Sequence, residues 1–176
     1  MTDFVQSQIP KLVLEAVRDL QNAGARPEVL ANWRRRRKLL LFGGKWRLET
    51  LGEAYRVGVL LLTESGEIWC AEGQTRAAKR ERLGVVSNSQ EYRRDLAGLA
   101  YDSGYATGTV INFGCTKMPQ DEQDLRALAA DPQAVIALSG NTLKVRWRAA
   151  ADLAQAPSLE AYLRDRVSLI LENSRS

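Results

Sequence analysis

The spacing of apolar residues changes along this 176-residue chain, from a helical period near both ends to a strand-like period in the middle. Between residues 7 and 24 the apolar positions recur every three or four residues, which predicts an amphipathic helix that Gly24 ends. Residues 158–172 have the same period after Pro157, which predicts a C-terminal helix with one apolar side.

The middle of the chain has the pattern of short antiparallel strands. Residues 46–51 roughly alternate between apolar and polar, 54–63 form a β-rich apolar run, and 68–71 follow turn residues at 64–67. Together these segments predict an antiparallel meander. The other predicted elements are a helix over 28–37 leading into a strand at 39–42, a surface loop over 75–87, a helix from Asn88 to near Gly104, a strand over 109–113, a helix from Pro119 through Ala130, and a hairpin that pairs 134–138 with 142–148.

This order of elements predicts an α+β fold, with a central antiparallel sheet covered by helices, rather than alternating βαβ units. A chain of this length buries roughly 70% of the surface that its unfolded form exposes, which is enough for one core. We therefore expect a single domain over residues 1–176. Its expected parts are a helical N-terminal part at 1–38, a sheet-rich core at 39–148 and a C-terminal helix at 158–172.

The chain contains no histidine, which excludes Ser-His-Asp and Cys-His catalysis and the zinc sites that use histidine. Its two cysteines, Cys70 and Cys115, are too few for a structural metal cage and are typical of reduced, partly buried thiols. The longest apolar run, 57–62, is far shorter than the roughly 18 residues that span a bilayer. We expect a cytoplasmic protein with no membrane partner and no cofactor.

Positive charge is concentrated in two clusters of the sequence. The formal net charge is +4, but residues 33–47 alone carry +7 and residues 76–82 carry +3, so the rest of the chain is at −6. The candidate partner-binding residues are therefore the cations of these clusters and the two tryptophans at the ends of the first: Trp33, Arg34, Arg35, Arg36, Arg37, Lys38, Lys45, Trp46, Arg47, Arg76, Lys79, Arg80 and Arg82.

Such clusters favour a non-catalytic binding protein whose partner is an acidic protein or another polyanion. Nucleic acid is the alternative partner, because arginine binds phosphate and exposed tryptophan stacks on bases. A second interpretation of the same residues is that the arginines coat a solvated helix or strand while Trp33 and Trp46 lie in the core. One continuous basic face would favour polyanion binding, and separate faces would favour solvation.

An enzyme is the less favoured alternative, as a hydrolase of a phosphorylated or amide substrate. The run 58–62 with the helix that carries Glu91, Asp95 and Asp102 is similar to the hairpin and helix of Nudix-type hydrolases, although the paired glutamates of that family are missing. Cys115, with Lys117 two residues later, is the other candidate. The carboxylates at 121, 122 and 124 could bind a cation, but acidic residues also belong at a helix N-terminus.

Several segments resemble a family of short uncharacterised bacterial proteins. The residues that carry this resemblance are 55–62, 66–69, Gly73 and 75–77, followed by Asn112-Phe113, Arg146-Trp147 and 162–167. The resemblance covers roughly residues 46–172 and implies an intact compact domain without an assigned reaction.

Overall fold

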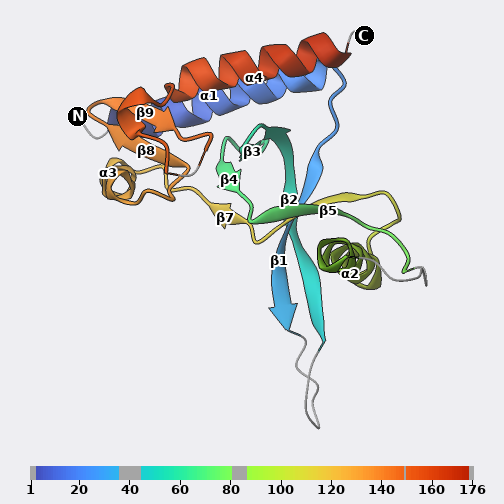
Figure 1. The fold of residues 1–176 in the computed structure, drawn as a ribbon. Coiled ribbons are helices and arrows are strands. Elements are labelled where there is room, and N and C mark those ends of the chain that lie inside the picture. Colours follow the sequence, from blue (N-terminus) through green and yellow to red (C-terminus); the bar gives the residue numbers. More distant parts are fainter. Residues whose placement is uncertain (1–2, 36–44, 81–86, 149, 175–176) are drawn as a thin grey trace. The chain divides into compact units, whose positions relative to one another are not determined.

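The computed structural model describes residues 3–35, 45–80, 87–148 and 150–174. Its elements within these residues are α1 (Asp3–Asn22), β1 (Glu28–Arg35), β2 (Trp46–Val57), β3 (Leu60–Leu62), β4 (Ile68–Cys70), β5 (Gly73–Arg76), α2 (Asn88–Asp102), β6 (Val110–Phe113), β7 (Thr116–Lys117), α3 (Glu122–Ala127), the 3-10 helix η1 (Leu128–Ala130), β8 (Ile136–Ser139), β9 (Thr142–Val145), the 3-10 helix η2 (Leu153–Gln155) and α4 (Leu159–Ser174) (Figure 1).

The strands form a seven-stranded sheet in the order β5-β6-β1-β2-β3-β4-β7, and β8 and β9 form a separate hairpin. The pairing is mostly antiparallel, with a parallel pair between β1 and β6. The predicted α+β class, built on an antiparallel sheet with helices, is therefore confirmed. The predicted meander is present as β2, β3 and β4. Its predicted bounds are wrong, because residues 46–57 form one strand and the first turn falls at Gly58 and Val59, inside the apolar run 54–63.

Contacts within the chain divide it into two compact units, and the long strand β2 contributes residues to both. The first unit comprises Met1–Pro27, Ala54–Cys70 and Thr116–Ser176, and the second comprises Glu28–Glu53 and Ala71–Cys115. Each unit has its own cluster of buried apolar side chains.

In the first unit, α1 and α4 lie side by side and run in the same direction (Figure 1). Their apolar faces pack with β2, β3 and β4 into a core that includes Val13, Leu20, Leu60 and Leu159. The turn between β2 and β3 contains Gly58 at a φ of 62°. Beside it, the backbone N–H of Val59 donates a hydrogen bond to the buried hydroxyl of Tyr162 on α4, at 3.0 Å.

In the second unit, β5, β6, β1 and the first part of β2 form the sheet, and Ala100 of α2 packs into its core with Ile111. Asn112 of β6 is fully buried. Its side-chain amide donates to Glu28 Oε2 at 2.9 Å and to the carbonyl of Val29 at 3.3 Å. These hydrogen bonds satisfy a polar side chain that would otherwise be costly to bury.

The helix predicted over residues 28–37 is wrong, because residues 28–35 form β1. Val29 and Leu30 pair with Ile111 and Asn112 of β6, more than 80 positions later in the chain. Helix propensity is a weak preference that such distant sheet pairing overrides. The strand predicted at 39–42 lies outside the described residues, as does much of the loop predicted over 75–87, whose first residues belong to β5.

Candidate functional site

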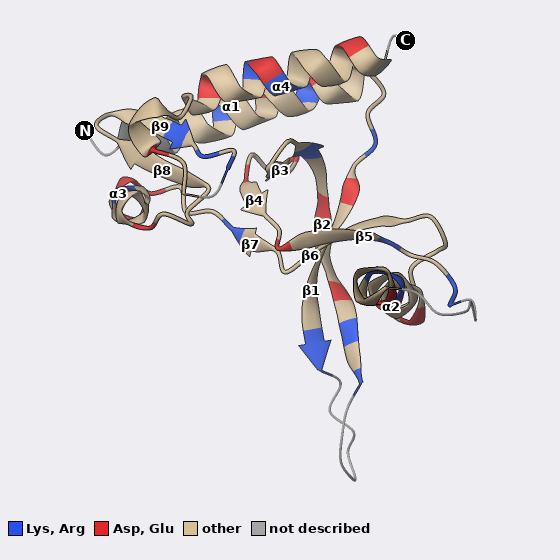
Figure 2. Ribbon diagram, in the orientation of Figure 1, with Lys and Arg blue, Asp and Glu red and all other residues tan. Residues whose placement is uncertain are grey.

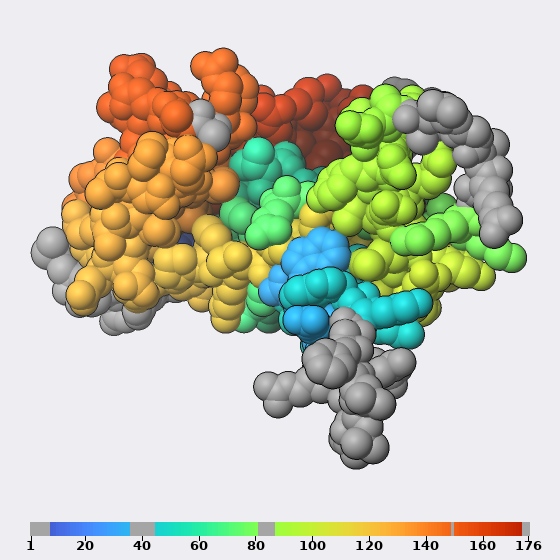
Figure 3. Space-filling view, turned by 60° about the horizontal axis from the view of Figure 1, so that its bottom comes forward, coloured from blue at the N-terminus to red at the C-terminus, as the bar shows by residue number. Residues whose placement is uncertain are grey.

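The described residues of the first basic cluster lie where β1 ends and β2 begins. Arg34 and Arg35 are the last residues of β1, Lys45 directly precedes β2, and Trp46 and Arg47 are its first residues. All five are exposed, and we call them the basic ribbon end. Figure 2 shows the blue segments of both strands together here, and Figure 3 shows the atoms of these strands at the surface. The predicted residues Arg36, Arg37, Lys38 and Arg82 lie outside the described part of the chain.

The cations of the basic ribbon end differ in whether they already have a partner. Arg34 forms an ion pair with Glu49 of β2. Arg35, Lys45 and Arg47 form no ion pair with any residue that the structure describes. The four cations of the basic ribbon end and the carboxylate of Glu49 together carry a formal charge of +3. This surface can therefore attract an anionic group without first breaking an internal ion pair.

The two predicted tryptophans have different surroundings. Trp33 is half-buried, and its ring centroid lies 5.3 Å from that of Phe113 in the core of the second unit. Trp46 has 54% of its surface exposed and stands between Lys45 and Arg47 in the sequence. Trp33 thus packs in the core, as the second interpretation holds, whereas Trp46 is accessible for stacking on a ligand.

Arg76 and Arg80, two described cations of the second basic cluster, have different surroundings from the basic ribbon end. The register pairs Arg76 with Val110 of β6 and pairs Ile111 with Val29 of β1, so Arg76 is level with the start of β1. At about 3.3 Å per residue, Arg34 is on the order of 20 Å further along the strands. Arg80 instead lies beside α2, where it pairs with Asp95 at 3.6 Å. Arg76 and Arg80 therefore do not extend the basic ribbon end, which favours the solvation interpretation for the second cluster. The basic ribbon end stays a candidate site because three of its cations have no ion-pair partner among the described residues.

The residues of the hydrolase alternative do not converge. Glu91 and Asp95 are exposed on α2, and Asp95 forms the ion pair with Arg80. Cys115 is buried, and its thiol donates to the carbonyl of Asn112 at 3.1 Å. Among the residues that the structure describes, no group of three or more Asp, Glu, Cys or His side chains could hold a metal ion. This geometry gives the hydrolase alternative no support.

The acidic residues near α3 cap that helix. The Asp121 carboxylate accepts a hydrogen bond from the backbone N–H of Asp124 at 2.8 Å, which lowers the pKa of Asp121. The hydrogen bond between the two side chains, with the charge of Asp121, raises the pKa of Asp124. Glu122 pairs with Arg126 one turn later. These contacts fit the capping interpretation of the cluster.

Lys117 is engaged by Glu67. Its Nζ lies 2.6 Å from Glu67 Oε1, and the indole N–H of Trp69 donates to Glu67 Oε2 at 3.1 Å. The hydrogen bond from Lys117, followed by that from Trp69, lowers the pKa of Glu67 below its ordinary value of 4.5.

We expect this pair to make stability depend on pH. A carboxylate whose pKa is lowered by folding stabilises the fold above pH 4.5, and this stabilisation is lost as the pH falls through the lowered pKa. Glu67→Gln should therefore lower the free energy of unfolding at pH 7, by less than about 1 kcal/mol because the pair is partly exposed. In urea denaturation, the difference between the variant and the wild type should shrink as the pH is lowered from 7 to 2.5. An equal difference at both pH values would show that the ionised pair has no role.

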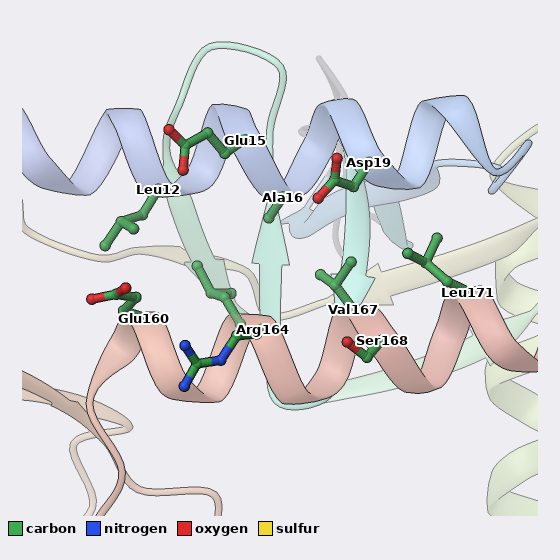
Figure 4. Close-up of a pocket in the computed structure, with 10 residues that line it drawn as sticks. Leu12, Glu15, Ala16, Asp19, Glu160, Arg164, Val167, Ser168 and Leu171 are labelled. Carbon is green, nitrogen blue, oxygen red and sulfur yellow. The ribbon is translucent and has the colours of Figure 1, made fainter.

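A surface groove that no sequence pattern indicates lies between α1 and α4 in the first unit (Figure 4). Its volume is about 270 Å³, and its charged lining residues are Glu15, Asp19, Glu160 and Arg164. The helical spacing of these residues along each helix is visible in the sequence. That the two helices lie side by side is a tertiary fact, and no local pattern indicates it.

Comparisons with known proteins gave no relative: no family model matches the chain, and no curated protein and no solved structure gives a significant match. The resemblance to short bacterial proteins therefore stays a prediction. None of the described helices is long and apolar enough to cross a bilayer.

Proposed function

We propose that this protein is a non-catalytic binding module that meets an anionic partner through the basic ribbon end. The observation that carries the proposal is that Arg35, Lys45 and Arg47 are exposed and have no ion-pair partner among the described residues. Unpaired surface cations that are close together attract anions at long range and contact them without desolvating an internal ion pair. The proposal includes the cytoplasmic location expected from the sequence.

Nucleic acid is the second candidate partner, and the exposure of Trp46 favours it. An exposed aromatic ring at the same strand end as several cations combines stacking on a base with contacts to phosphate, the combination that single-stranded nucleic acid requires. An acidic protein would use the same cations but would gain less from the ring. The two candidates therefore differ in how much binding depends on Trp46.

Binding of a fluorescent 15-nucleotide single strand and of polyglutamate to the full-length protein tests this proposal. The double variant K45A/R47A should weaken binding of either ligand at least tenfold at 50 mM salt. For the oligonucleotide it should also reduce the slope of log affinity against log salt by about 1.4, because each neutralised phosphate contributes roughly 0.7. Trp46→Ala should weaken binding of the oligonucleotide by roughly five- to hundredfold and should leave binding of polyglutamate unchanged.

The variant K79A/R80A is the matched control, because it removes the same charge from the second cluster. It should retain most of the affinity. Equal losses in the two double variants would show that only net charge matters, which would contradict a site at the basic ribbon end. Absence of binding to both ligands at low salt would contradict the proposed function.

A further inference from the structure

The groove between α1 and α4 has an apolar floor that the fold leaves partly open. Two helices running side by side leave a channel along their line of contact, and a third helix can pack into it. Leu163 and Val167 are buried in the core, whereas Leu12 and Leu171 are only half-buried. The floor is formed by Leu12, Ala16, Leu163, Val167 and Leu171.

The groove continues beyond the hollow shown in Figure 4. A second hollow of about 200 Å³ shares Leu12 and Glu160 with the first and extends it toward Thr142 and Leu143 of β9. From Glu160 to Leu171 alone, α4 rises on the order of 16 Å, which is about three helical turns. This length suits a short helix better than a single small molecule.

The rim of the groove is acidic. Glu15 and Asp19 from α1 and Glu160 from α4 face a single cation, Arg164, so the charged lining residues sum to −2. All four side chains are exposed, and none of them forms an ion pair with any residue in the described part of the chain. Carboxylates without partners beside an apolar floor are complementary to a ligand that is itself apolar and positively charged.

We propose that this groove docks a short amphipathic helix of a partner protein, with leucine-like residues on one face and Lys or Arg beside them. The apolar face of that helix would cover Leu12 and Leu171, and its cations would pair with Glu15, Asp19 and Glu160. This is the helix-in-groove mode of peptide recognition, with anchors every three or four residues. The site lies in the first unit and uses none of the residues of the basic ribbon end, so it goes beyond the function proposed above.

The test uses two synthetic helical peptides of about 18 residues that share one pattern of leucines and carry either lysine or glutamate at every polar position. The full-length K45A/R47A protein, in which the basic ribbon end is weakened, should bind the leucine-lysine peptide much more tightly than the leucine-glutamate peptide, by isothermal titration calorimetry at 50 mM salt. The wild-type protein should bind the leucine-lysine peptide with the same affinity as the K45A/R47A protein. The triple variant E15Q/D19N/E160Q should bind the leucine-lysine peptide at least tenfold more weakly. Each exposed ion pair contributes only a small factor to the affinity, and the three factors multiply. These substitutions are on the surface and should leave the circular dichroism spectrum unchanged.

The matched control, E53Q/E91Q/D102N, neutralises three exposed carboxylates of the second unit. It should bind the peptide like the wild type, and an equal loss in this control would contradict a site in the groove. Equal binding of the two peptides by the K45A/R47A protein, or no binding of the leucine-lysine peptide, would also overturn the proposal. Light scattering tests whether a second copy of the chain fills the groove instead. A wild-type dimer that becomes a monomer in the triple variant would show this and would overturn the proposal.

Discussion

Replacement of Arg146 by methionine is expected to lower the free energy of unfolding by about 3–5 kcal/mol. Arg146 directly follows β9, and only 7% of its surface is exposed. Its guanidinium donates to four backbone carbonyls from two segments of chain: Asp131 and Ala134 at 2.9 Å each, Ala151 at 3.1 Å and Ala129 at 3.3 Å.

The cost arises because one buried guanidinium joins the backbone of residues 129–134 to that of Ala151, although the carbonyl of Asp131 also accepts from the N–H of Ala134. Methionine fills a similar volume, but it leaves the carbonyls to find other donors. Arg146→Lys should also be destabilising, since an ammonium has three donors on one atom and does not match the spread of a guanidinium. Urea denaturation followed by circular dichroism measures the difference.

The matched control is Arg148→Met, two residues further along the chain. Arg148 is exposed and lies over the ring of Trp147, with its Cζ 5.2 Å from the ring centroid. A contact of this kind stabilises by about 0.5–1 kcal/mol. If Arg146→Met cost no more than Arg148→Met, the buried guanidinium would not be the structural link between the two segments.

Gly58→Ala is the second large expected effect, with a loss of about 3 kcal/mol or more in the free energy of unfolding. Gly58 has a φ of 62°, which side chains other than glycine rarely adopt. A Cβ added there would meet the Tyr162 hydroxyl oxygen at an impossibly close distance and would have Tyr162 Cζ at 3.1 Å. Tyr162 would have to move, and the hydrogen bond from the Val59 N–H would be lost.

Gly24→Ala separates the two contributions, because Gly24 has a φ of 74° and nothing within 4 Å of its added Cβ. It should cost only the backbone strain, about 1 kcal/mol. The side-chain overlap at Gly58 should also be smaller in a Tyr162→Phe background, where the offending oxygen is absent, so the double variant should lose less than the sum of the single losses. Equal costs at Gly24 and Gly58, or strict additivity, would contradict this explanation.

The sequence predicted best the elements whose stability depends on local pattern. The apolar spacing of residues 7–24 and 158–172 predicted α1 and α4, and the alternation and turn residues between 46 and 71 predicted the meander. The helix predicted for residues 28–35 was wrong, because these residues form a strand that pairs in parallel with β6, far along the chain. Arg146 was placed in a hairpin strand, whereas β9 ends at Val145, and no local signal indicated its carbonyl partners.

The candidate sites, too, could be predicted from the sequence only where they depend on local residue types. The sequence located the positive charge of residues 33–47, because charge is a property of composition and survives any fold. It could not distinguish Trp33 from Trp46, since both flank the same arginine-rich run and only packing against Phe113 buries one of them. It also could not reveal the acidic groove, because Glu15 and Glu160 are 145 positions apart.

By itself, therefore, the sequence determined the helical and strand-like faces, the absence of histidine chemistry and the location of the basic cluster. These depend on residue types and on neighbours within a few positions. Tertiary structure decided which strand β1 joins, which tryptophan is exposed, that Arg146 is buried, and that α1 and α4 enclose a groove. Each of these depends on partners distant in the chain, and the free energy of such contacts is not encoded in any local window of sequence.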